Sequence, residues 1–138
     1  MTIVYTDTIF NYTGAANTAL TAMYSGITST AGTYSPQLDG TLVKITILVV
    51  PQAASSLCQD QRVELSQTNW TPNVLRFPTG GFGLQTVGSG AWNAGGVNQY
   101  DFVVNQPVKT AWPITGNQIC PGTGPVTPAI FVTGYFTA

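Results

Sequence analysis

Histidine is absent from this sequence of 138 residues, and charged residues are scarce. Asp, Glu, Lys and Arg make up 7% of the chain, against about 25% in a typical soluble domain. Without histidine the chain lacks the commonest general base and the usual partner of a nucleophilic serine or cysteine. It also lacks the commonest metal ligand. We therefore predict that the chain is not an enzyme and that it binds neither a cofactor nor a metal.

Basic residues are too few and too scattered to form a stripe that could neutralise phosphates. The four are Lys44, Arg62, Arg76 and Lys109. The longest apolar run, residues 45–50, is far too short to cross a bilayer. Residues 1–7 contain neither a basic leader nor an apolar stretch. These features predict a chain that is made in the cytoplasm without a signal peptide, that reaches a virion by assembly, and that neither contacts nucleic acid directly nor inserts into a membrane.

The acidic residues offer one pair with a catalytic spacing. Asp60 and Glu64 lie four residues apart, so on a strand they share one face with Arg62 between them. Two carboxylates can serve a glycosidase, but an arginine lowers their pKa values rather than raising one of them. The spacing therefore predicts an exposed ladder of charges.

Neutral polar residues fill the positions where charges would normally stand, chiefly Thr, Ser, Asn, Gln and Gly. With a net charge of −1, such a surface has little self-repulsion and suits a subunit that packs against copies of itself. The alternative is a monomer kept soluble by hydroxyls, amides or attached sugar.

Alternating apolar and polar residues predict strands, and helix signals are nearly absent. In residues 41–50, Val43, Ile45, Ile47 and Val49 would form one apolar face. Gly- and Pro-rich turns separate the expected strands, which indicates one β-sandwich domain over residues 1–138. A jelly roll is the first choice and an immunoglobulin-like sandwich the second. The clearest strands are 41–50, 62–66, 100–105 and 129–138; weaker ones are 2–10, 74–77, 84–87 and 108–112, and residues 20–27 fit a helix or a strand.

The last expected strand is apolar on both faces. Ile130, Val132 and Phe136 alternate with Phe131 and Tyr135. One face must pack on the second sheet, and the other needs a further partner. Phe131 and Tyr135 are therefore candidate assembly contacts.

The two cysteines, Cys58 and Cys120, could form one disulfide closing a long loop, or remain two separate buried thiols.

The triplets beginning at Asn11 and Asn69 are candidate N-glycosylation sequons. Three tryptophans in or beside expected loops could cap the core, or could stack on sugar rings as in a lectin-like module. They are Trp70, Trp92 and Trp112.

The pattern over the whole length resembles single jelly-roll virion proteins of archaeal icosahedral viruses and related tailless phages. Residues 40–47, 62–66 and 127–136 carry this resemblance as expected strands. It implies a capsid shell, vertex or turret subunit, made in the host cytoplasm, whose partners are copies of itself and other virion proteins. Unlike many capsid proteins, the chain has no basic arm, which disfavours contact with the genome. A lectin-like module and a cell-surface or fimbrial subunit are the alternatives.

Overall fold

The computed structural model describes residues 2–13, 17–50, 57–87, 90–93, 98–123 and 129–138. These residues form strands and turns without any helix, so the predicted all-β class is confirmed, and none of them forms a helix that could cross a membrane. The strands are β1 (Tyr5–Tyr12), β2 (Asn17–Ala22), β3 (Tyr24–Ser25), β4 (Thr33–Tyr34), β5 (Gly40–Val50), β6 (Leu57–Ser66), β7 (Val74–Val87), β8 (Gly90–Asn93), β9 (Asn98–Val108), β10 (Ile114–Cys120), β11 (Gly122–Thr123) and β12 (Ala129–Thr137).

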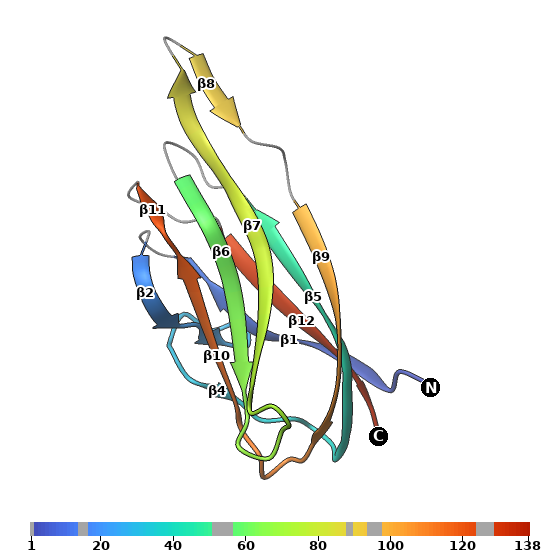
Figure 1. Cartoon of the computed structure of the whole chain (residues 1–138). Helices are drawn as coiled ribbons and strands as arrows, with labels where there is room; N and C mark the ends of the chain where they lie inside the picture. The colour runs from blue at the N-terminus through green and yellow to red at the C-terminus, as the bar shows by residue number, and fades with distance from the viewer. Residues whose placement is uncertain (1, 14–16, 51–56, 88–89, 94–97, 124–128) are drawn as a thin grey trace.

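The strands form two antiparallel sheets that lie face to face as a β-sandwich (Figure 1). One sheet has the order β3-β1-β12-β5-β9. The other has the order β2-β10-β6-β7-β8, with β4 paired to β10 and β11 paired to β6. We call them the β12 sheet and the β6 sheet.

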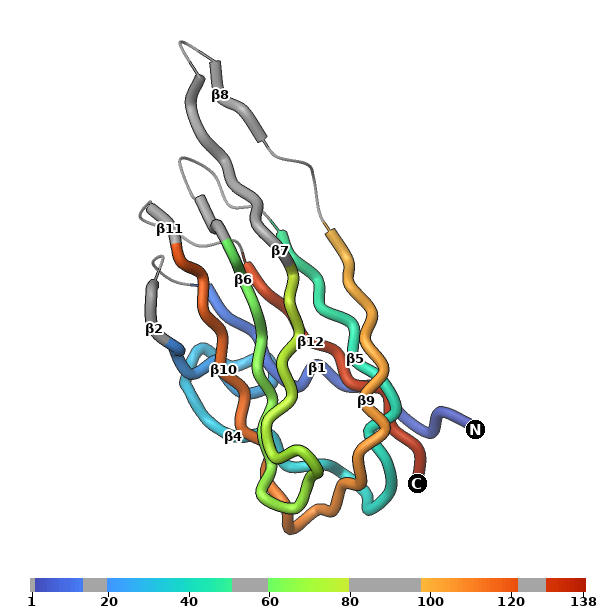
Figure 2. The backbone as a smooth tube through the Cα atoms, in the orientation of Figure 1, coloured from blue at the N-terminus to red at the C-terminus, as the bar shows by residue number. Residues whose placement is uncertain are grey.

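The main strand pairs are nested along the chain. β1 pairs with β12, β2 with β10, β5 with β9, and β6 with β7. Each pair encloses the next in sequence, as in a long two-stranded ribbon rolled up on itself. The outermost pair brings the two ends of the chain side by side, with Tyr5 opposite Phe136 (Figure 2).

Apolar residues from both sheets meet in one core. Val63 and Leu65 of β6 and Val104 of β9 are buried in it, and the ring of Phe102 packs against it. The two sheets approach each other closely at Gly116, where a Cβ atom would lie 2.7 Å from the ring of Phe10. This position therefore requires glycine, because any larger residue would collide with the facing aromatic ring.

One prediction about strand β5 is wrong for a local reason. Its inner face consists of Leu42, Ile45, Ile47 and Val49, which are all buried, whereas Val43 is only partly covered. The register shifts between Leu42 and Lys44. Such a bulge adds one residue to the strand and reverses the alternation before it.

Two strand boundaries were also predicted wrongly. The strands expected at residues 74–77 and 84–87 are not separated by a turn, because both belong to the single strand β7. The β6–β7 ladder instead shifts register beside Pro78, and a bulge tolerates the missing N–H of proline. Of the strand expected over residues 108–112, Val108 is the last residue of β9, a turn follows it, and the next strand, β10, begins at Ile114. Residues 20–27, which fitted either helix or strand, lie on β2, β3 and the turn after them.

The C-terminal strand β12 lies centrally, hydrogen-bonded to β1 and β5. Ile130, Val132 and Phe136 are fully buried between the sheets. Phe131 and Tyr135 face outward on the other side of the strand. The strand is therefore apolar on both faces, as expected, with one face in the core and the other on the outside of the sheet.

Candidate functional site

The outer face of the β12 sheet holds both candidate assembly contacts. Phe131 is 40% exposed and lies opposite Leu48, while Tyr135 lies opposite Lys44. Lys44 in turn lies opposite Val103, which is 74% exposed. Cα partners in a ladder share a face. We call the following set the outer β12 face: Lys44, Thr46, Leu48, Asp101, Val103, Phe131 and Tyr135.

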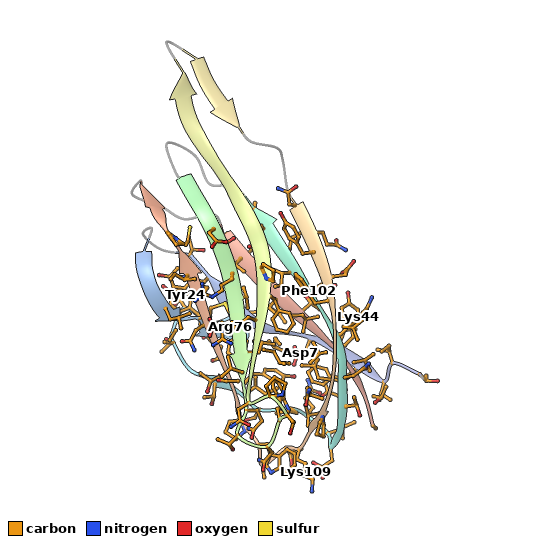
Figure 3. The ribbon with its side chains drawn as sticks, viewed as in Figure 1. Asp7, Tyr24, Lys44, Arg76, Phe102 and Lys109 are labelled. Atoms are coloured by element: carbon orange, nitrogen blue, oxygen red, sulfur yellow. The ribbon has the colours of Figure 1, made fainter. Side chains whose placement is uncertain are left out.

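A small polar network crosses this face. Thr46 Oγ1 donates a hydrogen bond to Asp101 Oδ1 at 2.6 Å and lies 3.4 Å from Tyr135 Oη. Lys44 Nζ stands 4.6 Å from the centroid of the Tyr135 ring (Figure 3). The hydrogen bond from Thr46 lowers the pKa of Asp101, desolvation partly opposes it, and Gln99 and the charge of Lys44 add to the lowering. Within this network the positive charge of Lys44 balances the negative charge of Asp101.

A pocket of about 500 Å³ lies at the end of the sandwich where the β6–β7 loop meets the β9–β10 loop. This volume is within the range of about 300–1,000 Å³ that small-molecule sites occupy. Its polar lining consists of neutral side chains: Ser66, Gln67, Thr68, Asn69, Asn73 and Thr115. Its apolar lining is Val74, Ala111, Trp112 and Pro113.

Gln67 joins the two loops that form this pocket. Its Nε2 donates to the carbonyl oxygen of Pro113 at 2.6 Å, and its Oε1 accepts from the backbone and side-chain nitrogens of Asn69 at 3.0 and 2.9 Å. Its backbone N–H also donates to the carbonyl of Asn73 at 3.0 Å. A buried amide with this many partners fixes the shape of the pocket before any ligand arrives.

The three tryptophans have different positions. Trp70 is 1% exposed, and its Nε1 donates to the carbonyl of Pro107 at 2.7 Å, so its indole caps the core and cannot stack on a ligand. Trp92 lies on β8, and its side chain is outside the described residues. Trp112 is partly exposed and forms a wall of the pocket. Lys109 Nζ stands 5.0 Å from the centroid of the Trp112 ring. Figure 3 labels Lys109 at the lower end of the molecule.

The two sequon asparagines are both engaged. Asn11 Nδ2 donates to the carbonyl oxygens of Gly26 and Thr28 at 2.6 and 2.9 Å, which ties the turn after β3 to β1. Asn69 Nδ2 donates to Gln67, so a glycan on Asn69 would begin at the pocket and would replace that hydrogen bond.

Cys120 is buried and disulfide-bonded. Its own strand leads directly into β11, where Gly122 lies opposite Cys58 in the β6 ladder. The side chain of Cys58 is outside the described residues. Since the sequence has only two cysteines, a bond within one chain joins these two neighbouring strands.

The charge ladder on β6 differs from the expectation at one residue. Asp60 is exposed as predicted, but Glu64 is buried. Its Oε2 lies 2.8 Å from Arg62 Nε and 3.5 Å from Arg76 Nε. Two arginines therefore form ion pairs with one buried carboxylate.

A second polar cluster links β1 to β4 and was not found in the sequence. Asp7 Oδ2 accepts from Tyr34 Oη at 2.8 Å and from Gln37 Nε2 at 3.1 Å. Burial, and next the hydrogen bond to Asp7, raise the pKa of Tyr34 far above its usual range. No sequence signal connects these residues, because 27 positions separate Asp7 from Tyr34.

Within the described part of the chain, no three residues among His, Cys, Asp and Glu come together as a metal site would require. Comparisons of the chain with family models, with curated proteins and with solved structures returned no match.

Proposed function

We propose that the chain is a single jelly-roll subunit of a virion shell, vertex or turret, made in the host cytoplasm, that acts through contacts with copies of itself and with other virion proteins. The nested pairing of β1 with β12, β2 with β10, β5 with β9, and β6 with β7 carries this proposal. Eight strands rolled into two sheets define a jelly roll, a fold used by viral capsid and lectin domains.

The strand order disfavours the immunoglobulin-like alternative. In that fold the first two strands are neighbours in the same sheet. Here β1 belongs to the β12 sheet and β2 to the β6 sheet. The chain therefore crosses from one layer to the other between its first two long strands, which supports the jelly roll.

The outer β12 face supports the assembly part of the proposal. Val103 and Phe131 are both large and exposed there, and they flank the ordered Thr46–Asp101 network. Exposed apolar groups beside polar groups are typical of protein contact surfaces. The nine charged residues of the whole chain provide little repulsion between copies.

The test is the particle state of the purified chain, measured by analytical ultracentrifugation and negative-stain electron microscopy. We expect rings or shells whose formation depends weakly on salt, because few charges are available to be screened. A wild-type chain that stays monomeric up to high concentration at both low and high salt would contradict the proposal.

Two variants locate the contact. Phe131→Asp places a charge on the outer β12 face without touching the core, and it should abolish assembly while the melting temperature stays close to that of the wild type. Ile27→Asp is the matched control, because Ile27 is 88% exposed in the turn after β3 and is not a residue of the outer β12 face. Equal assembly of both variants would exclude the outer β12 face as the contact.

A further inference from the structure

We propose that the pocket between the β6–β7 and β9–β10 loops binds a neutral saccharide. None of its ten lining residues has an ionisable side chain, so none of them offers a counter-charge to an acidic or basic ligand. Lys109, whose Nζ stands 5.0 Å from the centroid of the Trp112 ring, is not among the lining residues. A ligand of matching chemistry is uncharged and rich in hydrogen-bonding groups, yet has an apolar face. A pyranose ring meets all three conditions, because its C–H groups form a flat apolar surface inside a rim of hydroxyls.

The pocket supplies complementary groups for both parts of such a ring. Trp112 gives an aromatic wall on which the C–H face can stack. The side chains of Ser66, Asn73 and Thr115 make no hydrogen bond in the described structure. Hydroxyl and amide side chains can each donate and accept hydrogen bonds, and so can sugar hydroxyls. These side chains can therefore pair with a sugar hydroxyl either as donor or as acceptor.

The positions of these groups are fixed in advance. Gln67 holds the two loops together through Pro113 and Asn69. The backbone N–H of Trp112 donates to the carbonyl of Lys109 at 2.9 Å, and Lys109 also covers part of the indole. A pocket that is already ordered loses little conformational entropy on binding. All of its walls come from a single chain, so we expect binding whether or not the chain assembles.

Binding is tested with the full chain produced in a host that adds no N-glycans, so that Asn69 stays unmodified. A glycan array with neutral and acidic members identifies the best saccharide, and titration calorimetry measures its affinity. We expect saturable binding to neutral members. Trp112→Ala should weaken it by about tenfold, the effect of losing one aromatic stacking contact.

Asn73→Ala tests the same pocket without risk to the fold, because the Asn73 side chain is exposed and its backbone carbonyl still accepts from Gln67. The loss of one hydrogen bond should weaken binding by about fivefold. Phe131→Ala, which removes an exposed aromatic ring on the outer β12 face, is the control and should bind like the wild type.

Three results would overturn the proposal. The first is no saturable binding of any saccharide by the folded wild-type chain. The second is unchanged affinity in both Trp112→Ala and Asn73→Ala. The third is that these variants disrupt particles in the absence of saccharide, since the pocket would then receive a neighbouring copy.

Discussion

Replacing Tyr34 with phenylalanine removes one hydroxyl from the partly buried cluster of Asp7, Tyr34 and Gln37 and leaves the aromatic ring in place. The Tyr34 ring lies 5.9 Å from the Phe136 ring, centroid to centroid, and phenylalanine keeps this stacking. The hydroxyl itself donates to Asp7 Oδ2 at 2.8 Å. The substitution therefore isolates one hydrogen bond to a carboxylate.

The expected cost at neutral pH follows from that bond. Hydrogen bonds to charged groups contribute about 1.5–3 kcal/mol. Asp7 keeps its second partner, Gln37 Nε2 at 3.1 Å, so its oxygen is not left without a donor. We expect Tyr34→Phe to lower the free energy of unfolding by about 1.5 kcal/mol, the low end of that range.

The Tyr34 hydroxyl should also make the free energy of unfolding depend on pH in the alkaline range. Burial raises the pKa of Tyr34 above its ordinary value of 10.0, so the folded chain holds this proton after the unfolded chain has released it. The contribution of the Tyr34 hydroxyl to the free energy of unfolding is fully present below about pH 10, and it falls as the pH rises toward the pKa that this hydroxyl has in the folded chain. One proton gives a loss of about 1.4 kcal/mol by pH 11.

Urea unfolding of the wild type and Tyr34→Phe at several values from neutral pH to about pH 11 measures both effects. The other tyrosines are common to both chains, so their titration cancels in the difference. We expect the wild type to be the more stable at neutral pH and the two curves to converge near pH 11. A difference that stays constant over this range would show that the Tyr34 hydroxyl is not buried against Asp7.

Two further predictions concern other parts of the sandwich. Gly116→Ala places a methyl group against Phe10 and should lower the free energy of unfolding by about 1–3 kcal/mol, as measured by urea unfolding; stability equal to the wild type would mean that the sheets are farther apart there. The pKa of Asp101 is lowered chiefly by Thr46, so its contribution is present above its ordinary value of 3.8 and is lost as the pH falls through the folded value. The wild type should therefore lose melting temperature below about pH 4 more steeply than Asp101→Asn, and parallel curves would contradict this.

The all-β class and the strands with strong alternation could be predicted from the amino-acid pattern alone. Residues 41–50 and 129–138 correspond closely to β5 and β12, because a buried face must repeat every second residue. Alternation also placed Phe131 and Tyr135 on the face opposite the core. These are local properties, which short stretches of sequence encode.

Other features of the strands depend on contacts between residues that are distant in the chain, and these could be read only from the tertiary structure. The bulge after Leu42 reversed the alternation at Val43, and β7 continued through Pro78 because β6 pairs with both halves of it. The partners across these ladders fix such details, and a single strand does not reveal them.

The pocket also depends on pairing between strands that are distant in the chain. Its two walls come from residues 66–74 and 111–115, which are adjacent only because β10 pairs with β6, with Thr115 opposite Ser66. The sequence offered three equivalent tryptophans, whereas packing buried Trp70 in the core and left Trp112 at the pocket wall. Neutral polar composition could predict a polar surface, but only the sheet pairing could gather those side chains around one indole.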